Sequence, residues 1–109
     1  MKSIDYKAKN KMLIHYNRVK PFANVCKVTG TLEYANAEVE YIPNDKVIDI
    51  CDYRRWFEGD VKNLLIEDIA QELFDEIQTS INPKYLCVRI YLEGNPMLTD
   101  WFVEIKTNN

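Results

Sequence analysis

Residues 65–83 decide the fold and read Leu-Ile-Glu-Asp-Ile-Ala-Gln-Glu-Leu-Phe-Asp-Glu-Ile-Gln-Thr-Ser-Ile-Asn-Pro. Apolar residues recur in this stretch at helical spacing, namely Leu65, Ile69, Leu73, Ile77 and Ile81. Acidic and amide side chains fill the opposite side, as in a helix that buries one face. Asn82 ends the pattern, because a residue that precedes proline avoids the helical conformation. The stretch predicts one long amphipathic helix, for which Asp60 is the expected N-cap.

Strands are predicted on both sides of this helix. Residues 85–92 and 97–106 follow it as two strands, and Glu93-Gly94-Asn95-Pro96 joins them as a hairpin. Upstream, residues 34–42 alternate between apolar and polar side chains, which is typical of a strand with one buried face. A first strand is predicted over 11–19, ending before Pro21, and residues 26–31 are expected to form a loop. A short helix is predicted over 50–57.

The predicted order is therefore β-β-α-α-β-β, an α+β fold. It has four antiparallel strands in one sheet, with two helices on one face. Such a sheet has two unpaired edges, which expose it to pairing with other chains. Joining several subunits into a shared barrel would close these edges, so we expect a homo-oligomer. An active site would then tend to lie between subunits.

Length and composition favour one domain over residues 1–109 and a cytoplasmic protein. Apolar residues make up 47% of the chain, enough for a packed core. No signal peptide and no apolar run of membrane-spanning length is present. The three cysteines are odd in number and widely spaced, which indicates a reducing compartment rather than a disulfide framework.

Charge is distributed unevenly along the chain, although the formal net charge is only −3. Up to Lys27 there are seven basic residues and one acid, Asp5. A local basic segment can hold phosphates even on an acidic protein. The alternative is a solvated N-terminus, and residues 1–10 are expected to form a flexible basic segment. The sequence leaves both interpretations open.

Cys26 is the first candidate for chemistry, because it lies in the predicted loop with Lys27 beside it. A nearby cation and loop amides can lower the pKa of a thiol and make it nucleophilic. The alternative is a small buried apolar residue, which is what most free cysteines are. Cys51 and Cys87 fall within predicted elements and are interpreted as packing residues.

Glu67 is the second candidate and lies near the start of the long helix. A carboxylate has two acceptor oxygens, so it can bind the two adjacent donors of guanine's Watson–Crick edge. The alternative is a solvated acid near a helix N-terminus. No metal is expected, because His15 is the one histidine and no Cys or His pair has ligand spacing. His15 is interpreted as structural.

Four short motifs follow one another between residues 20 and 93. They are Phe22-Ala23-Asn24-Val25-Cys26-Lys27-Val28-Thr29-Gly30, Tyr41-Ile42-Pro43, Glu67-Asp68 and Asn82-Pro83-Lys84-Tyr85. In this order and spacing they resemble the NADPH-dependent 7-cyano-7-deazaguanine reductases of queuosine synthesis, a family with the tunnelling fold. The first motif is similar to that family's nucleophile loop, Phe-x-x-x-Cys-Pro-x-Thr-Gly. Glu33 stands where the family has a proton-transferring aspartate.

One segment departs from that family. The basic signature that serves the NADPH phosphates is replaced by Asp49-Ile50-Cys51-Asp52-Tyr53-Arg54. An acid here disfavours a phosphate, although Arg54 and Arg55 could compensate in part. The chain is more similar to the short reductase-like amidinotransferases that make archaeosine, which lack this signature and keep the cysteine.

This resemblance implies a function and a set of site residues. Cys26 would add to the nitrile carbon of a 7-cyano-7-deazaguanine nucleotide to give a thioimide, and ammonia would then displace the thiol to leave a formamidine. Glu33 would handle the proton, Glu67 and Thr29 would bind the substrate, and Lys27, Arg54 and Arg55 could contact phosphates. No cofactor is required. The nucleic acid would be tRNA or DNA, which suits the basic N-terminal segment.

Two alternatives remain open from the sequence. One is a true nitrile reductase that uses NADPH and makes 7-aminomethyl-7-deazaguanine, with Arg54 and Arg55 at the cofactor phosphates. The other is a non-catalytic protein of the same fold that binds a 7-deazaguanine or a nucleic acid.

Overall fold

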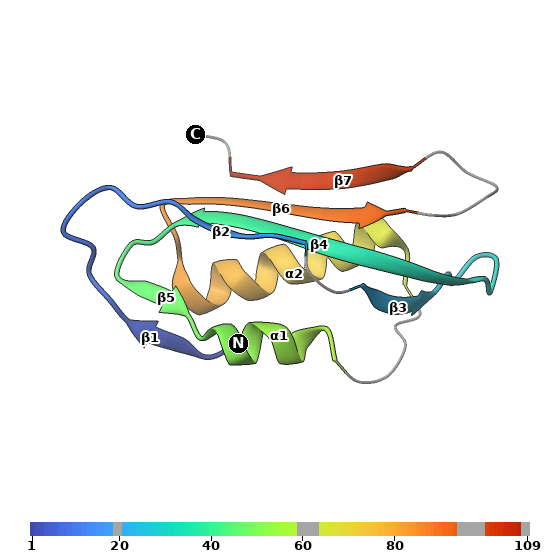
Figure 1. Ribbon diagram of the computed structural model, residues 1–109, viewed down its shortest axis with the longest axis horizontal. Helices are drawn as coiled ribbons and strands as arrows, with labels where there is room; N and C mark the ends of the chain where they lie inside the picture. Colours follow the sequence, from blue (N-terminus) through green and yellow to red (C-terminus); the bar gives the residue numbers. More distant parts are fainter. Residues whose placement is uncertain (19–20, 59–63, 94–99, 108–109) are drawn as a thin grey trace.

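The protein is described by a computed structural model covering residues 1–18, 21–58, 64–93 and 100–107 (Figure 1). The elements in chain order are β1 (Ser3–Asp5), β2 (Ile14–Tyr16), β3 (Phe22–Val25), β4 (Leu32–Ile42), β5 (Lys46–Ile48), α1 (Ile50–Trp56), α2 (Ile66–Ile81), β6 (Tyr85–Leu92) and β7 (Trp101–Lys106). Among these described residues, no helix is long and apolar enough to cross a membrane.

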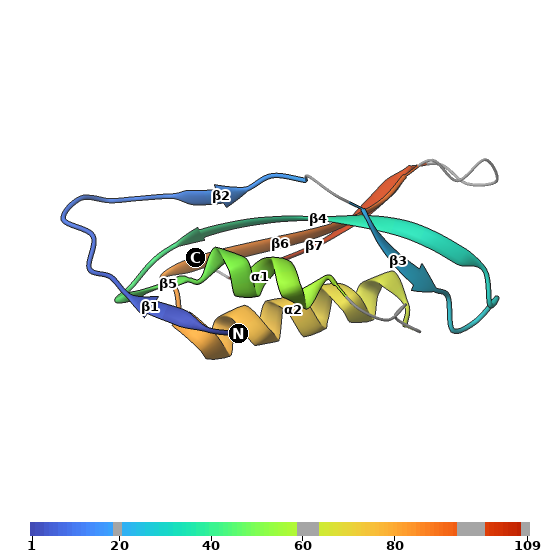
Figure 2. The ribbon, with the colours of Figure 1, turned by 60° about the horizontal axis from the view of Figure 1, so that its bottom comes forward.

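The larger sheet has five strands rather than the four predicted. Its order is β2-β4-β6-β7, with β3 also paired to β4, and all pairings are antiparallel. Both helices lie against the same face of this sheet (Figure 2), as the sequence predicts. The fold is therefore α+β, and both predicted helices lie in the chain between β5 and β6.

The predicted first strand over 11–19 is replaced by two shorter strands that pair with different parts of β4. β2 pairs Tyr16 with Val39, and β3 pairs Phe22 with Ala35. β2 ends at Tyr16 and β3 begins at Phe22, so the two pairings with β4 are separate. The interruption includes Pro21, which has no backbone N–H to donate to a ladder. The sequence prediction located the break but missed the strand that follows it.

A second, two-stranded sheet pairs β1 with β5, and neither strand was predicted. Within residues 1–10, for which a flexible segment was predicted, Ser3–Asp5 form a paired strand. Backbone bonds continue the pairing at both ends, from Tyr6 N to Asp45 O and from Asp49 N to Lys2 O, each 3.0 Å long. The N-terminal ammonium group also pairs with Glu76 of α2. These long-range contacts fix the N-terminal segment.

The core lies between the larger sheet and α2. The alternation predicted for residues 34–42 is confirmed, since Ala35, Ala37, Val39 and Tyr41 are buried on β4. The helical stripe is confirmed as well, with Ile69, Leu73, Ile77 and Ile81 of α2 fully enclosed. Burial of this apolar surface is the main stabilising contribution to the fold.

The helix boundaries differ in part from those predicted. α2 begins at Ile66 with Leu65 as its N-cap and without a capping side chain. Asp60 was the predicted N-cap; it lies outside the described residues and is too far back in the chain for that position. The C-terminal end is confirmed, because Asn82 adopts the left-handed conformation at φ 42°. α1 ends one residue earlier than predicted and is capped by the Asp49 side chain.

The last strand is confirmed from Trp101 onward, where β7 pairs with β6. The expected hairpin over 93–96 and the first residues of the strand predicted over 97–106 fall mostly outside the described residues.

Candidate functional site

Cys26 lies in a tight turn between β3 and β4, in the loop that the sequence predicts. Two backbone bonds close the turn: Gly30 N donates to Cys26 O at 2.8 Å, and Cys26 N donates to Thr31 O at 3.0 Å. Gly30 has φ +72°, a conformation that a residue without Cβ adopts easily. Lys27, Val28 and Thr29 between these points are exposed. The turn therefore presents the thiol at the surface on a closed backbone frame.

The turn favours the thiolate form of Cys26. The Thr29 side chain donates a hydrogen bond to the sulfur, as do the backbone amides of Thr29 and Val28, and together they lower the pKa of the thiol. Desolvation and the nearby Glu33 charge act in the opposite direction but are weaker. Hydrogen bonds to the charged form are a recognised way of producing a reactive cysteine.

Lys27 is not among the groups that lower the pKa of the Cys26 thiol, contrary to the prediction from the sequence. Its ammonium lies 3.5 Å from Asp68 Oδ2, in the first turn of α2. Hydrogen bonds from the turn, rather than the adjacent cation, lower the pKa of Cys26. The ion pair instead connects the Cys26 turn (residues 26–31) with the helix that carries Glu67.

Glu33 is held in place by Asn24, a residue that the sequence analysis did not single out. The Asn24 side chain is completely buried, and its Nδ2 donates to Glu33 Oε1 at 2.8 Å and to Leu64 O at 2.9 Å. Its Oδ1 accepts from Leu64 N at 3.3 Å. One amide thus joins β3, β4 and the segment that enters α2. Its satisfied polar groups explain why an asparagine is tolerated in the interior.

We expect Asn24→Ala to lower the free energy of unfolding by about 2 kcal/mol, because it leaves part-buried groups of Leu64 and Glu33 without this partner. Chemical denaturation measures this change. Asn17→Ala is the matched control, since Asn17 is exposed and should change stability little. Equal effects of the two substitutions would contradict the bridging role of Asn24.

Replacement of Thr29 by Val tests the environment of the thiol. Thr29→Val removes the side-chain donor and should raise the pKa of Cys26. Alkylation of Cys26 by iodoacetamide should then be several-fold slower at neutral pH, and its rate–pH profile should move to higher pH. Thr31→Val, at the other end of the turn, is the control. An unchanged profile for Thr29→Val would contradict the hydrogen bond.

Glu67 lies at the same end of the molecule as the Cys26 turn. It is the second residue of α2, exposed, and adjacent to the Asp68 that pairs with Lys27. The bond from Leu64 to Asn24 anchors the chain just before it. The structure therefore places Cys26 and Thr29 on one turn, Glu33 near the start of the adjoining β4, and Glu67 on the neighbouring helix end.

Arg54 and Arg55 are not part of this group. Both are exposed on α1, where Arg54 pairs with Glu58 at 3.6 Å and Arg55 with Asp52 at 3.8 Å. Asp52 also accepts from Lys2 N at 2.6 Å. The two arginines thus pair with local acids, whereas the remaining predicted residues cluster at the Cys26 turn and the start of α2.

The other two cysteines differ from each other. Cys87 is buried in β6, so its interpretation as a packing residue is confirmed. Cys51 is exposed on α1, so the same interpretation was wrong for it. The short helix buries mainly Tyr53, which leaves Cys51 on the solvent side.

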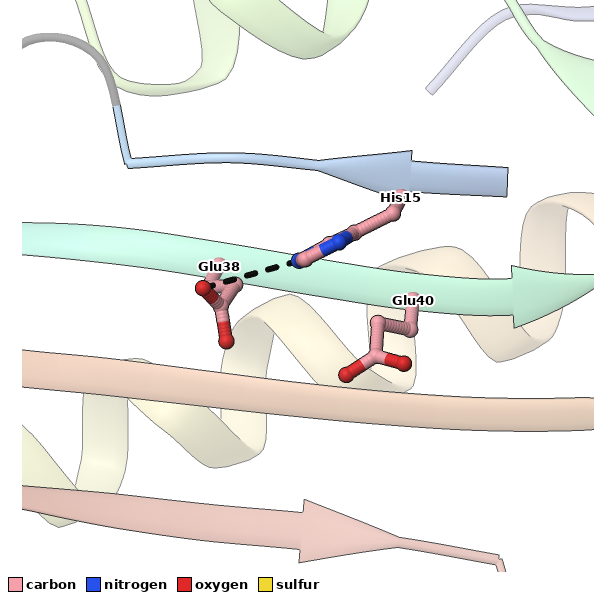
Figure 3. A group of neighbouring side chains, drawn as sticks. All are labelled: His15, Glu38 and Glu40. Atoms are coloured by element: carbon pink, nitrogen blue, oxygen red, sulfur yellow. Dashed lines mark ion pairs between the residues drawn. The ribbon is translucent and has the colours of Figure 1, made fainter. Parts of the chain in front are cut away.

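A second group of side chains lies on the helix-free face of the larger sheet. His15 of β2 and Glu38 and Glu40 of β4 approach one another there (Figure 3). His15 Nε2 lies 3.5 Å from Glu38 Oε2. This group was not predicted from the sequence, although the alternation along β4 places both glutamates on the polar face.

Comparisons with known proteins confirm the resemblance to the 7-cyano-7-deazaguanine reductase superfamily. No protein-family model matches the chain. An archaeosine synthase from Pyrobaculum calidifontis is 26% identical over 68 residues, which cover 62% of this chain and 62% of that protein. An NADPH-dependent 7-cyano-7-deazaguanine reductase from a Nitratiruptor species is 30% identical over 77 residues, which cover 69% of this chain and 56% of the reductase. The chain thus spans less than two thirds of either relative.

A solved structure shares the fold. The apo form of the archaeosine synthase QueF-Like superposes with a TM-score of 0.76 at 19% identity, over 94% of this chain and 98% of that one. At this identity the likeness concerns the fold.

Proposed function

We infer from these similarities that the chain is a member of the 7-cyano-7-deazaguanine reductase superfamily, and we propose that it converts the nitrile of a 7-cyano-7-deazaguanine nucleotide to a formamidine. The observation that carries this proposal is the Cys26 turn, whose hydrogen bonds lower the pKa of the thiol. A thiolate at neutral pH is what attack on a nitrile carbon requires.

The proposed reaction has two steps. The Cys26 sulfur bonds to the nitrile carbon, and the thiol proton is transferred to the nitrile nitrogen, which gives a covalent thioimide. Ammonia then adds to the same carbon and the carbon–sulfur bond breaks. The thiol is regenerated and the product carries one added ammonia, so no oxidant or reductant is needed.

Glu33 is the proposed proton carrier. Its Oε1 is fixed by Asn24 at 2.8 Å, and its charge is felt at the Cys26 sulfur, so it lies close to the reacting atoms. A carboxyl group held in this way can deliver a proton to the nitrogen of the thioimide. Asn24 limits the orientations that the carboxyl can adopt.

Glu67 is the proposed guanine-binding residue, and Thr29 contributes through the thiolate that it stabilises. The carboxylate is exposed at the start of α2, where the helix dipole favours a negative charge. It can accept both donors of the guanine edge. Lys27, paired with Asp68 beside it, is a candidate contact for a substrate phosphate.

The alternative function is NADPH-dependent reduction of the nitrile, as the name of the Nitratiruptor relative suggests. Here the segment that would hold the cofactor contains Asp49 as an N-cap and Asp52 against Lys2 N. Arg54 and Arg55 pair with local acids. These contacts favour the cofactor-free reaction, since a dinucleotide phosphate would have to displace them.

We further propose that the active unit is a homo-oligomer acting on tRNA or DNA in the cytoplasm. The Cys26 turn is open, with Lys27, Val28 and Thr29 exposed, whereas a base-binding pocket encloses most of its ligand. Strands of a second subunit could complete a barrel and cover the turn. Basic residues before Lys27 could then contact the phosphates of the nucleic acid that presents the flipped base.

Product analysis separates the two reactions. An oligonucleotide that contains 7-cyano-7-deazaguanine is incubated with the protein and either ammonium or NADPH, and its mass is measured. The proposal predicts the gain of one ammonia with ammonium alone. A gain of four hydrogens with consumption of NADPH would establish the reductase instead. Tight binding without a mass change would support a non-catalytic binding protein.

A further inference from the structure

The group on the helix-free face of the sheet has the geometry of a metal site. His15 stands directly opposite Glu40 in the β2–β4 register, and Glu38 follows two residues away on the same face. One ligand atom from each of the three lies within 4.8 Å of the others. The imidazole is accessible, with 40% of its side chain exposed, while Glu38 and Glu40 are largely enclosed.

The imidazole of His15 and the carboxylate of Glu38 have the separation that a shared metal ion produces. His15 Nε2 and Glu38 Oε2 are 3.5 Å apart, too far for a strong hydrogen bond. Zinc bonds to nitrogen and oxygen of about 2.0–2.2 Å in a tetrahedron put two ligand atoms roughly 3.3–3.6 Å apart. An ion between these two atoms would therefore require little movement of either side chain.

Arg89 of β6 orients the carboxylates of Glu38 and Glu40 by bonding one oxygen of each. Its Nη1 donates to Glu38 Oε1 and to Glu40 Oε1, both at 2.7 Å. Glu38 Oε2 is left facing His15, as Figure 3 shows. Outer hydrogen bonds of this kind fix the ligands of natural metal sites. The guanidinium also repels a metal ion, so we expect moderate rather than tight binding.

The charged side chains around His15 carry a net negative charge, which a further cation could balance. Arg89 Nε also bonds Glu104 Oε1 at 2.7 Å, and Lys106 lies 3.9 Å from the other oxygen of Glu104. The cluster thus has three carboxylates, of Glu38, Glu40 and Glu104, against two permanent cations. One negative charge is uncompensated while His15 is neutral, the form in which it can bind a metal.

We propose that His15, Glu38 and Glu40 bind one divalent transition metal ion, with Arg89 holding the two carboxylates from behind. One imidazole and two carboxylates fit zinc, and water would complete its coordination at the exposed side of His15. The site is independent of the Cys26 chemistry, because none of its residues lies on the Cys26 turn or on α2.

Calorimetric titration with zinc tests the proposal on the Cys26→Ser/Cys51→Ser variant, which lacks the two accessible thiols. We expect one ion per chain. His15→Ala and the isosteric Glu40→Gln, each added to that background, should weaken binding by at least about 100-fold. Glu72→Gln is the control, since it removes the same charge from an exposed position on α2. Circular dichroism checks that each variant is folded.

Cobalt in place of zinc identifies the ligands. Cys87 stands opposite Glu40 on β6, but it is buried and its Sγ donates to Glu104 Oε1 at 3.6 Å, so it is not counted among the ligands. The cobalt complex should therefore show no sulfur-to-metal charge-transfer band. Such a band, the absence of zinc binding, or binding equally strong in folded His15→Ala would overturn the proposal.

Discussion

Cys26→Ala is expected to reduce nitrile conversion by more than about 10³-fold, because it removes the atom that forms the covalent intermediate in the proposed mechanism. The protein should remain folded, since the turn is closed by backbone bonds that involve the amide and carbonyl of residue 26 but not its side chain. Conversion is measured by mass spectrometry of a 7-cyano-7-deazaguanine oligonucleotide with ammonium in excess.

Cys51→Ala is the matched control for this variant. Cys51 is also a free, accessible thiol, but it lies on α1 and is absent from the turn. Its replacement should leave conversion unchanged. Full activity of Cys26→Ala would rule out the thioimide mechanism, and equal losses in both variants would indicate a general requirement for free thiols instead.

Glu67→Gln is expected to reduce kcat/KM by roughly 100-fold. A carboxylate can accept both donors of the guanine edge, whereas an amide accepts one and turns its own N–H₂ toward the other. Loss of charge-assisted hydrogen bonds in a site that recognises them costs a few kcal/mol. Steady-state kinetics with the modified oligonucleotide measure the change, which should appear mainly in KM if binding of the base is weakened.

Glu72→Gln provides the comparison for Glu67. It is the same substitution at another exposed position of α2, more than one turn further along. It should leave kcat/KM within about two-fold of the unaltered protein, as surface substitutions away from a site usually do. If Glu67→Gln behaved like Glu72→Gln, guanine recognition would have to be assigned to another residue.

The sequence was informative where periodicity was long and regular. The stripe of α2 and the alternation of β4 were both predicted, because each spans many residues and buries one face. The three-residue strands β1 and β5 were not, since each is too short to show a period. Their pairing depends on contacts between Ser3–Asp5 and Lys46–Ile48, far apart in the chain. No local pattern reports such contacts.

The candidate site at the Cys26 turn was predicted only in part, because the sequence does not reveal the directions of side chains and amides. The turn around Cys26 could be located from glycine and proline positions, and Glu67 from its place on a helix. The source of the low thiol pKa could not, because it depends on the direction of the Thr29 hydroxyl and of two amides. Lys27 was the obvious cation in the sequence but pairs with Asp68.

Asn24 is a clearer example of a residue whose role could not be predicted from the sequence. An asparagine between apolar strand residues has no evident role until its partner, the backbone of Leu64, is known. His15 is likewise too far from Glu38 and Glu40 in the sequence for the three to form a ligand motif. Contacts across strands and between distant segments thus account for most of what the sequence did not predict.

The mass of the intact protein after incubation with 7-cyano-7-deazaguanine, free and within an oligonucleotide, tests the central claim most directly. The proposed mechanism predicts an increase by the mass of one substrate, located on the peptide that contains Cys26 and lost when ammonium is added. An unmodified protein mass throughout a reaction in which the nitrile is consumed, or an adduct on Cys51 or Cys87 alone, would contradict it.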